Sequence, residues 1–228
     1  MAEKFYLTKE TPVVILNYPR SGSNFLSYLI RTLYGKELWK NHGQTQCFWE
    51  YPFNLLFVLR NYKECITSFT GPGWAAASDF DRNASFNEND VFSMTGHAKA
   101  LPNYLRLLKH YDELEKDKML VYYEDFVLDP VATLEEVVKF LTNFGWSVSE
   151  EAKQEFYKNI EKHRKISYGN AESSAPFAEH KSNGKDLIFH SDNLPIEQRI
   201  NTDNYIKKYH SHLWEKYLKR YEETYDSK

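Results

Sequence analysis

Residues 13–35, VVILNYPRSGSNFLSYLIRTLYG, pass from an apolar run through a short polar turn into an amphipathic segment. The β-branched run at 13–16 is typical of a strand that is buried on both faces of a parallel sheet. Apolar residues then recur at helical spacing, so we expect a helix to begin near Ser23 or Asn24. The segment therefore predicts a strand, a loop and a helix in direct succession.

The loop between this strand and this helix carries groups that bind anions. A helix start presents unpaired backbone N–H groups and the positive end of the helix dipole, and Gly22 lets the backbone approach an anion closely. The spacing GxxxxGK[ST] of the nucleotide-binding P-loop is absent, which disfavours an ordinary kinase. The loop predicts a phosphate site, and a plain strand-to-helix turn is the alternative. Positive charge and polar donors around it come from Arg20, Ser21, Ser23 and Asn24.

The composition of the 228 residues fits one α/β domain over residues 1–228. A net charge of −3 gives no general reason to expect nucleic acid or an anionic membrane as a partner. The N-terminal stretch is polar and no apolar run approaches membrane-spanning length, so we expect a soluble, cytoplasmic protein without membrane insertion. Cys47 and Cys65 lack metal-ligand spacing and fit a reducing compartment.

Strand and helix signals alternate along the chain, which predicts a central parallel sheet with helices on both faces. A ligand is then expected at the carboxyl ends of the strands. The polar stretches at 71–96 and 166–194 are expected to be irregular loops. The other expected elements are strands at 54–59 and 119–123, and helices around Cys65, over 97–114, after Asp129-Pro130, over 150–165 and over most of 195–225.

Four stretches together match the motifs of a known family. They are YPRSGSNFL at 18–26, WKNHGQ at 39–44, VLRNYKECITSF at 58–69 and MLVYYEDFVLDP at 119–130. They resemble the 5′-phosphosulfate loop, the K-T-H-L-P stretch, the 3′-phosphate motif and the LxYEDMxxDP stretch of sulfotransferases that use 3′-phosphoadenosine 5′-phosphosulfate (PAPS). The resemblance implies a P-loop-like strand-loop-helix in an α/β domain. It also implies transfer of a sulfuryl group to a hydroxyl or amine, with adenosine 3′,5′-bisphosphate as product.

The resemblance implies a role for each matching residue. His42 would be the general base, while Lys40 and Arg20 would neutralise the charge that develops during transfer. The 3′-phosphate would be held by Arg60 and Ser68. The 5′-phosphosulfate would be held by Arg20, Ser21, Gly22, Ser23 and Asn24, the adenine by Phe25 and Tyr123, and the family's late 3′-phosphate contact would be replaced by Lys181 and Gly184.

Several positions depart from the family's pattern, and some alternatives stay open. Tyr62 replaces a proline of the 3′-phosphate motif, and Gly43-Gln44 replaces the leucine and proline after the histidine. Phe25 is equally well explained as a core residue. Sulfuryl transfer demands no metal, and a small molecule or a carbohydrate would be the acceptor. The alternatives are an atypical P-loop nucleotide kinase and a non-catalytic nucleotide-binding protein of the same fold, and the oligomeric state is left open.

Overall fold

The computed structural model describes residues 13–41, 53–70, 97–163 and 190–223. These residues group into two compact units, and the chain passes from one to the other several times. The single domain expected over residues 1–228 stays a prediction. Of the described residues, the first unit holds 13–17, 21–41, 53–59 and 116–163, and the second holds 18–20, 60–70, 97–115 and 190–223.

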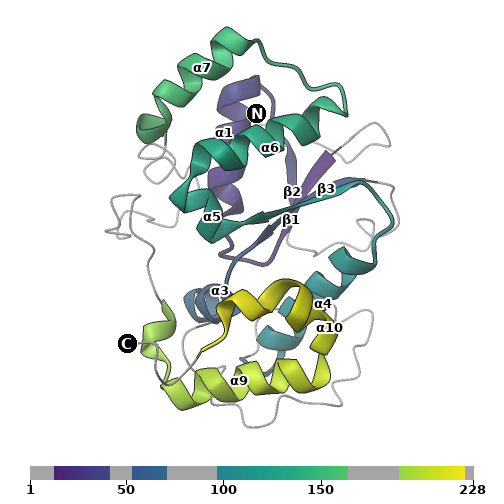
Figure 1. Cartoon of the computed structure of the whole chain (residues 1–228), viewed down its shortest axis with the longest axis vertical. Coiled ribbons are helices and arrows are strands. Elements are labelled where there is room, and N and C mark those ends of the chain that lie inside the picture. Colours follow the sequence, from purple (N-terminus) through teal and green to yellow (C-terminus); the bar gives the residue numbers. More distant parts are fainter. Residues whose placement is uncertain (1–12, 42–52, 71–96, 164–189, 224–228) are drawn as a thin grey trace, which may run out of the picture. The chain divides into compact units, whose positions relative to one another are not determined.

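A parallel sheet of four strands forms the first unit (Figure 1). Along the chain the strands are β1 (Val13–Asn17), β2 (Trp39–Asn41), β3 (Asn54–Leu59) and β4 (Lys118–Tyr122), and across the sheet the order is β2-β1-β3-β4. Asn17 lies opposite Val58, so β1 and β3 end at the same edge. The chain leaves β1 toward β2 and later returns on the other side of β1. This reversal makes the carboxyl ends of β1 and β3 a topological switch point, where open α/β sheets bind their ligands.

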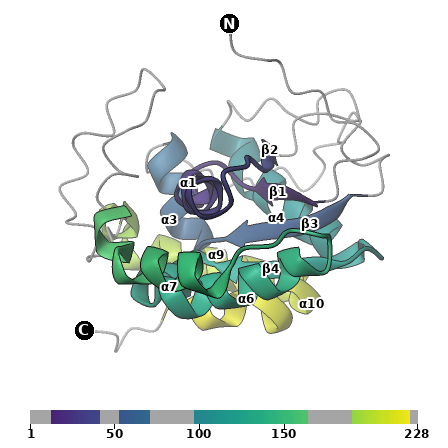
Figure 2. The same cartoon turned by 90° about the horizontal axis from the view of Figure 1, so that it is seen from above.

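Helices pack against one face of this sheet and close a continuous hydrophobic core. The side chains of Ile15, Leu56 and Val58 on the strands are buried with Leu26 and Leu29 on the first helix. Seen from above, α6 runs alongside β4 (Figure 2). The helices of this unit are α1 (Ser23–Tyr34), α5 (Tyr123–Leu128), α6 (Pro130–Thr142) and α7 (Glu150–Lys158). The expected α/β class, with a parallel sheet flanked by helices, is therefore confirmed, and the expected covering of both faces stays a prediction.

Most expected elements of the first unit are confirmed, one strand was missed, and one expected strand end is wrong. As expected, α1 begins at Ser23. The Asp129 side chain caps α6 by accepting a hydrogen bond from the Ala132 N–H at 3.0 Å. β2 was not expected, because three residues are too few to show a strand pattern and the strand is defined by its pairing with β1. The strand expected to reach Tyr123 ends one residue earlier, and Tyr123 begins α5.

The second unit consists of helices. The helix expected over 97–114 is confirmed to within one residue, whereas the long C-terminal helix is interrupted at His210. Asn61 caps the first helix of the unit, because its side chain accepts a hydrogen bond from the Lys63 N–H at 3.0 Å. The elements are α3 (Tyr62–Thr70), α4 (His97–Glu113), α9 (Ile196–Tyr209), α10 (Ser211–Leu213), the 3₁₀ turns η4 (His190–Asn193) and η6 (Lys219–Tyr221), and the π turn η5 (Trp214–Leu218).

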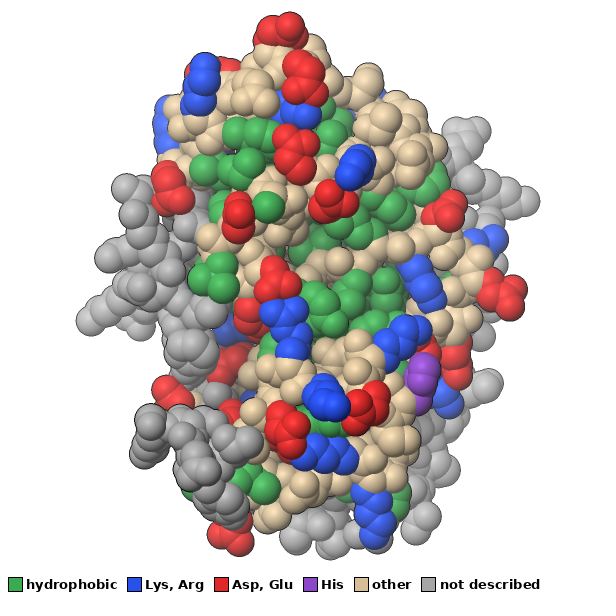
Figure 3. All heavy atoms as spheres, viewed as in Figure 1, with side chains coloured by type: hydrophobic (Ala, Val, Ile, Leu, Met, Phe, Trp, Pro, Cys, Tyr) green, Lys and Arg blue, Asp and Glu red, His purple; other side chains and the backbone are tan. Residues whose placement is uncertain are grey.

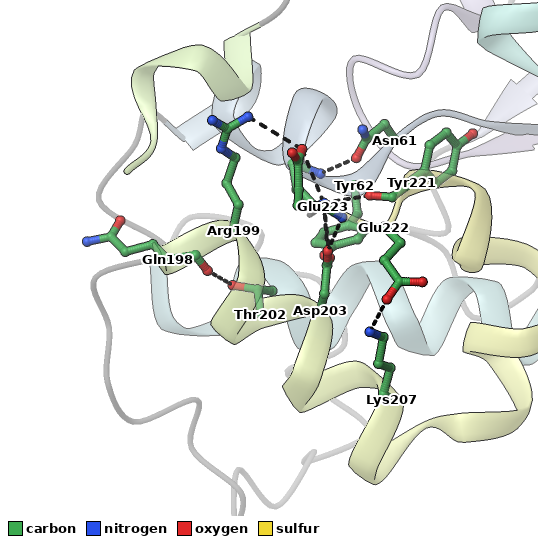
Figure 4. Close-up of polar contacts among 11 residues, drawn as sticks. Asn61, Tyr62, Gln198, Arg199, Thr202, Asp203, Lys207, Tyr221, Glu222 and Glu223 are labelled. Carbon is green, nitrogen blue, oxygen red and sulfur yellow. Dashed lines mark hydrogen bonds and ion pairs between the residues drawn. The ribbon is translucent and has the colours of Figure 1, made fainter. Parts of the chain in front are cut away.

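A buried polar network ties α3 to α9 and to the end of the described chain (Figure 4). The Lys63 ammonium, fully buried, lies 3.0 Å from an Asp203 carboxylate oxygen and donates to the Tyr221 carbonyl at 2.6 Å. The Tyr62 hydroxyl and the Glu223 backbone N–H also donate to Asp203. Burial lowers the pKa of Lys63 and raises that of Asp203, and the attraction between the two charges opposes both shifts. Tyr62, which departs from the family pattern, therefore joins α3 to α9.

Removing one partner of this pair is expected to destabilise the fold strongly. Asp203→Ala removes the nearer of two carboxylates from the buried Lys63 ammonium and leaves that of Glu223 at 3.5 Å, so the free energy of unfolding should fall by about 3 kcal/mol. Denaturant titration followed by circular dichroism measures the loss. Lys207→Ala is the matched control, because it breaks the exposed Lys207–Glu222 pair and should cost at most about 1 kcal/mol. Equal effects of the two substitutions would contradict the role given to Asp203.

Candidate functional site

The loop between β1 and α1 is held in an unusual backbone conformation. Arg20 and Gly22 have φ values of 67° and 87°, and no other described residue but glycine shares the positive φ of Arg20. A proline followed by a residue with positive φ, as in Pro19-Arg20, is the arrangement of a type II turn. Two left-handed residues directly before α1 turn the backbone sharply between β1 and the helix start.

The start of α1 has no side-chain cap. Gly22 precedes the helix, and its carbonyl accepts hydrogen bonds from the Phe25 and Leu26 N–H groups at 3.0 and 3.4 Å. The N–H groups of Ser23 and Asn24, in the first turn, cannot find partners within the helix. A helix of this length also carries a partial positive charge at its start. The first turn of α1 therefore offers donors and a favourable field to an anion.

The Ser21 hydroxyl is buried beside this helix start. Ser21 is 1% exposed, and its oxygen has no hydrogen-bond partner among the residues that the structure describes. Burying an unpaired hydroxyl costs free energy, which a hydrogen bond to a ligand would recover. A ligand oxygen beside Ser21 would accept that hydrogen bond.

Tyr123 explains why position 22 must be glycine. A Cβ at this position would lie 2.2 Å from Cδ2 of the Tyr123 ring, far inside contact distance. The left-handed backbone at Gly22 adds a second requirement, because other residues rarely adopt it. The ring of Tyr123 therefore forms one side of the loop, and its expected contact with adenine stays a prediction.

Lys40 lies on β2, and the pairing of β2 with β1 brings its side chain to the start of α1. It lies opposite Ile15 in the β1–β2 pairing, and its ammonium donates a hydrogen bond to the Asn24 side-chain oxygen. Burial lowers the pKa of Lys40, and the charge of Glu37 opposes that shift. The structure thus brings Lys40 and Asn24 together, as both of their expected roles require. The Lys40 ammonium thus adds a positive charge at the start of α1. The first turn of this helix contains no acidic residue.

Arg60 lies in the second unit, directly after β3, and is 8% exposed. One of its guanidinium nitrogens donates to the Arg20 carbonyl at 3.0 Å, and another lies 3.8 Å from the Glu64 carboxylate. The Tyr104 hydroxyl donates to the Arg60 carbonyl at 2.8 Å. Arg60 is therefore a buried residue paired with Glu64, and it does not form a surface salt bridge. Ser68, its expected partner on the 3′-phosphate, is half-buried on α3.

Three expected site residues lie outside the described residues. They are His42, Lys181 and Gly184. In the sequence, His42 directly follows the last residue of β2. Phe25 is described, and it packs in the core with its ring centroid 4.6 Å from that of Phe126. This position favours the core alternative for Phe25 over a role in stacking on adenine.

Comparison of the sequence with models of known protein families and with curated proteins finds no match. The site must therefore be interpreted from its own geometry and from the resemblance of its motifs. Sequence reasoning missed Glu64 and Tyr104, the residues that hold Arg60. The spacing of four residues between Arg60 and Glu64 was the only available signal for that pair.

The described residues were also searched for metal-binding clusters and membrane-spanning helices. Within them, no cluster of three or more His, Cys, Asp or Glu side chains is arranged to hold a metal ion. No helix among them is both long enough and apolar enough to cross a bilayer. Acidic and basic side chains are interspersed on the face drawn in Figure 3.

The contact between Gly22 and Tyr123 is testable by stability measurements. Gly22→Ala should lower the free energy of unfolding by about 1–2 kcal/mol for the left-handed backbone and by about 1–3 kcal/mol more for displacing the ring. Gly35→Ala is the control, because Gly35 has a φ of 65° with nothing near its would-be Cβ. Removing the ring in the Gly22→Ala, Tyr123→Ala double variant should recover part of the excess. Equal losses for Gly22→Ala and Gly35→Ala would refute the contact.

Proposed function

We propose that this chain is a PAPS-dependent sulfotransferase acting on a hydroxyl or amine of a small-molecule or carbohydrate acceptor. The observation that carries the proposal is the buried, unpartnered hydroxyl of Ser21 beside the uncapped start of α1. Gly22 and Lys40 complete a site whose polar groups are hydrogen-bond donors and a cation. A tetrahedral oxyanion such as a phosphate or a sulfate satisfies such a set.

Two features select this donor over an ordinary nucleoside triphosphate. The loop lacks the lysine and the spacing of a P-loop that grips a triphosphate. A second basic residue, Arg60, directly follows β3, the strand beside β1, within a stretch that resembles the 3′-phosphate motif of the family. In the proposal, Ser21 to Asn24 hold the 5′-phosphosulfate, and Arg60 and Ser68 hold the 3′-phosphate. A donor with phosphates at two positions needs both sites.

The proposed reaction is an in-line displacement at sulfur. The acceptor oxygen forms a new bond to sulfur while the bond from sulfur to the bridging phosphate oxygen breaks, and adenosine 3′,5′-bisphosphate leaves. His42 takes the proton of the acceptor hydroxyl, since an imidazole titrates near neutral pH. Lys40 and Arg20 stabilise the negative charge that spreads over the sulfuryl group and the leaving phosphate. The chemistry on this account is positioning and electrostatic stabilisation.

A substitution at Ser21 distinguishes a ligand site from a loop that has only a structural role. Ser21→Ala removes an unpaired buried hydroxyl, so the free energy of unfolding without ligand should stay constant or rise. The same change should weaken binding of adenosine 3′,5′-bisphosphate about tenfold or more, because a hydrogen bond to a charged group is lost. Isothermal titration calorimetry and denaturant titration measure the two effects. Ser27→Ala, a half-buried serine within α1, is the control and should change neither. Loss of stability without loss of affinity for Ser21→Ala would refute the site.

Turnover tests the reaction itself. The protein should transfer labelled sulfate from PAPS to at least one member of a panel of phenols, sterols and sugars, with no added metal. His42→Ala should reduce this rate by about 10²-fold or more, in keeping with loss of a general base, while adenosine 3′,5′-bisphosphate still binds. Binding without transfer to any acceptor would favour the non-catalytic alternative. Transfer of phosphate from ATP that depends on Mg²⁺ would favour the kinase alternative.

A further inference from the structure

Arg20 occupies a backbone conformation that an arginine avoids. Its φ of 67° lies in the left-handed region, where the side chain crowds the following carbonyl. Glycine would adopt this conformation freely, and asparagine would adopt it more readily than arginine. Residues held in such regions persist only where the surrounding structure compensates for the strain, and they concentrate at functional sites.

A compensating contact lies within the second unit. Arg60 donates from a guanidinium nitrogen to the carbonyl of Arg20 at 3.0 Å. Arg60 is itself fixed, by Glu64 at its side chain and by the Tyr104 hydroxyl at its carbonyl. The ring of Tyr18 packs edge-on against that of Tyr104, with centroids 5.4 Å apart. The segment 18–20 is therefore held by a rigid, buried donor.

The held carbonyl also sets the next peptide group. A trans peptide is planar, so its N–H points opposite to its carbonyl. No cis peptide occurs among the described residues. While the carbonyl of Arg20 faces Arg60, the N–H of Ser21 must face away from it. Reversal of this peptide would present a carbonyl oxygen, which repels an anion, in place of that N–H.

We propose that Arg60 is a positioning residue for the phosphosulfate loop, acting through the Arg20 carbonyl, in addition to any contact with a 3′-phosphate. The inference rests on the proposed function for its ligand, but the hydrogen bond and the strain belong to the protein alone. A side chain that served only the 3′-phosphate would have no effect on ligands that lack this group. A positioning residue affects every ligand of the loop.

The first experiment measures the coupling between the two residues without any nucleotide. Arg60→Met should lower the Tm of the natural protein and of an Arg20→Ala background by similar amounts, because alanine needs the same left-handed backbone. In an Arg20→Gly background the loss should be at least about half again as large, because arginine and alanine regain their backbone strain when the released loop relaxes, whereas glycine has no strain to regain. Comparing alanine with glycine separates the strain from the charge of Arg20. The loss of the Arg60–Glu64 ion pair is common to all three backgrounds and cancels. Equal losses in all three backgrounds overturn the inference.

The second experiment compares two nucleotides. Adenosine 5′-monophosphate lacks the 3′-phosphate, so an Arg60 that only contacts this phosphate would leave its affinity unchanged. On the present inference Arg60→Met weakens adenosine 5′-monophosphate about fivefold or more, through the displaced loop, and weakens adenosine 3′,5′-bisphosphate further. Arg60→Lys keeps the charge but not the fork of donors, and serves if the methionine variant does not fold. It should weaken adenosine 5′-monophosphate as well.

The outcomes separate this inference from the proposed function. Unchanged affinity for adenosine 5′-monophosphate in both Arg60 variants overturns the positioning role and leaves the sulfotransferase proposal intact. If the natural protein binds neither nucleotide, the proposed function fails. The stability comparison then still decides whether Arg60 holds Arg20.

Discussion

The reversal of the chain between β1 and α1 is the constraint on which the candidate site depends. Two residues with left-handed backbone, Arg20 and Gly22, stand on either side of Ser21 and bring it to an uncapped helix start. Each has its own support. Tyr123 lies against Gly22 in the first unit, and Arg60 holds the carbonyl of Arg20 in the second. A loop that is strained and supported in this way is preorganised, so little ordering remains to be done when an anion binds.

Two buried polar groups differ in how the free-energy cost of removing them from water is compensated. Asp203 is 1% exposed and accepts hydrogen bonds from Tyr62, Lys63 and the backbone of Glu223, so its burial is compensated within the protein. Ser21 is equally buried, and its hydroxyl has no partner among the described residues. The first pattern is that of a structural anchor. The second is that expected of a group whose partner arrives with a ligand.

Periodicity in the sequence was enough to predict β1, β3, α1, α4 and α6, because long apolar patterns report burial directly. β2 was not predicted, because a strand of three residues is defined by its pairing with β1 and not by a sequence pattern. The resemblance named Lys40 as a site residue, but only the parallel register of β1 and β2 brings it to Asn24. The support of Arg60 by Tyr104 joins residues far apart in the chain, and no local pattern encodes it.

The sequence by itself determined the alternation of strands and helices, the glycine at position 22, and the donors around it, since these follow from local spacing and residue type. The tertiary structure decided which of those donors are buried, which are already satisfied, and what supports the strained backbone. Burial and hydrogen bonding depend on neighbours that are distant in sequence, such as Tyr123 for Gly22 and Asp203 for Lys63. For this reason the sequence could only suggest an anion site, whereas the folded chain shows that the hydroxyl of Ser21 is buried without a hydrogen-bond partner among the described residues.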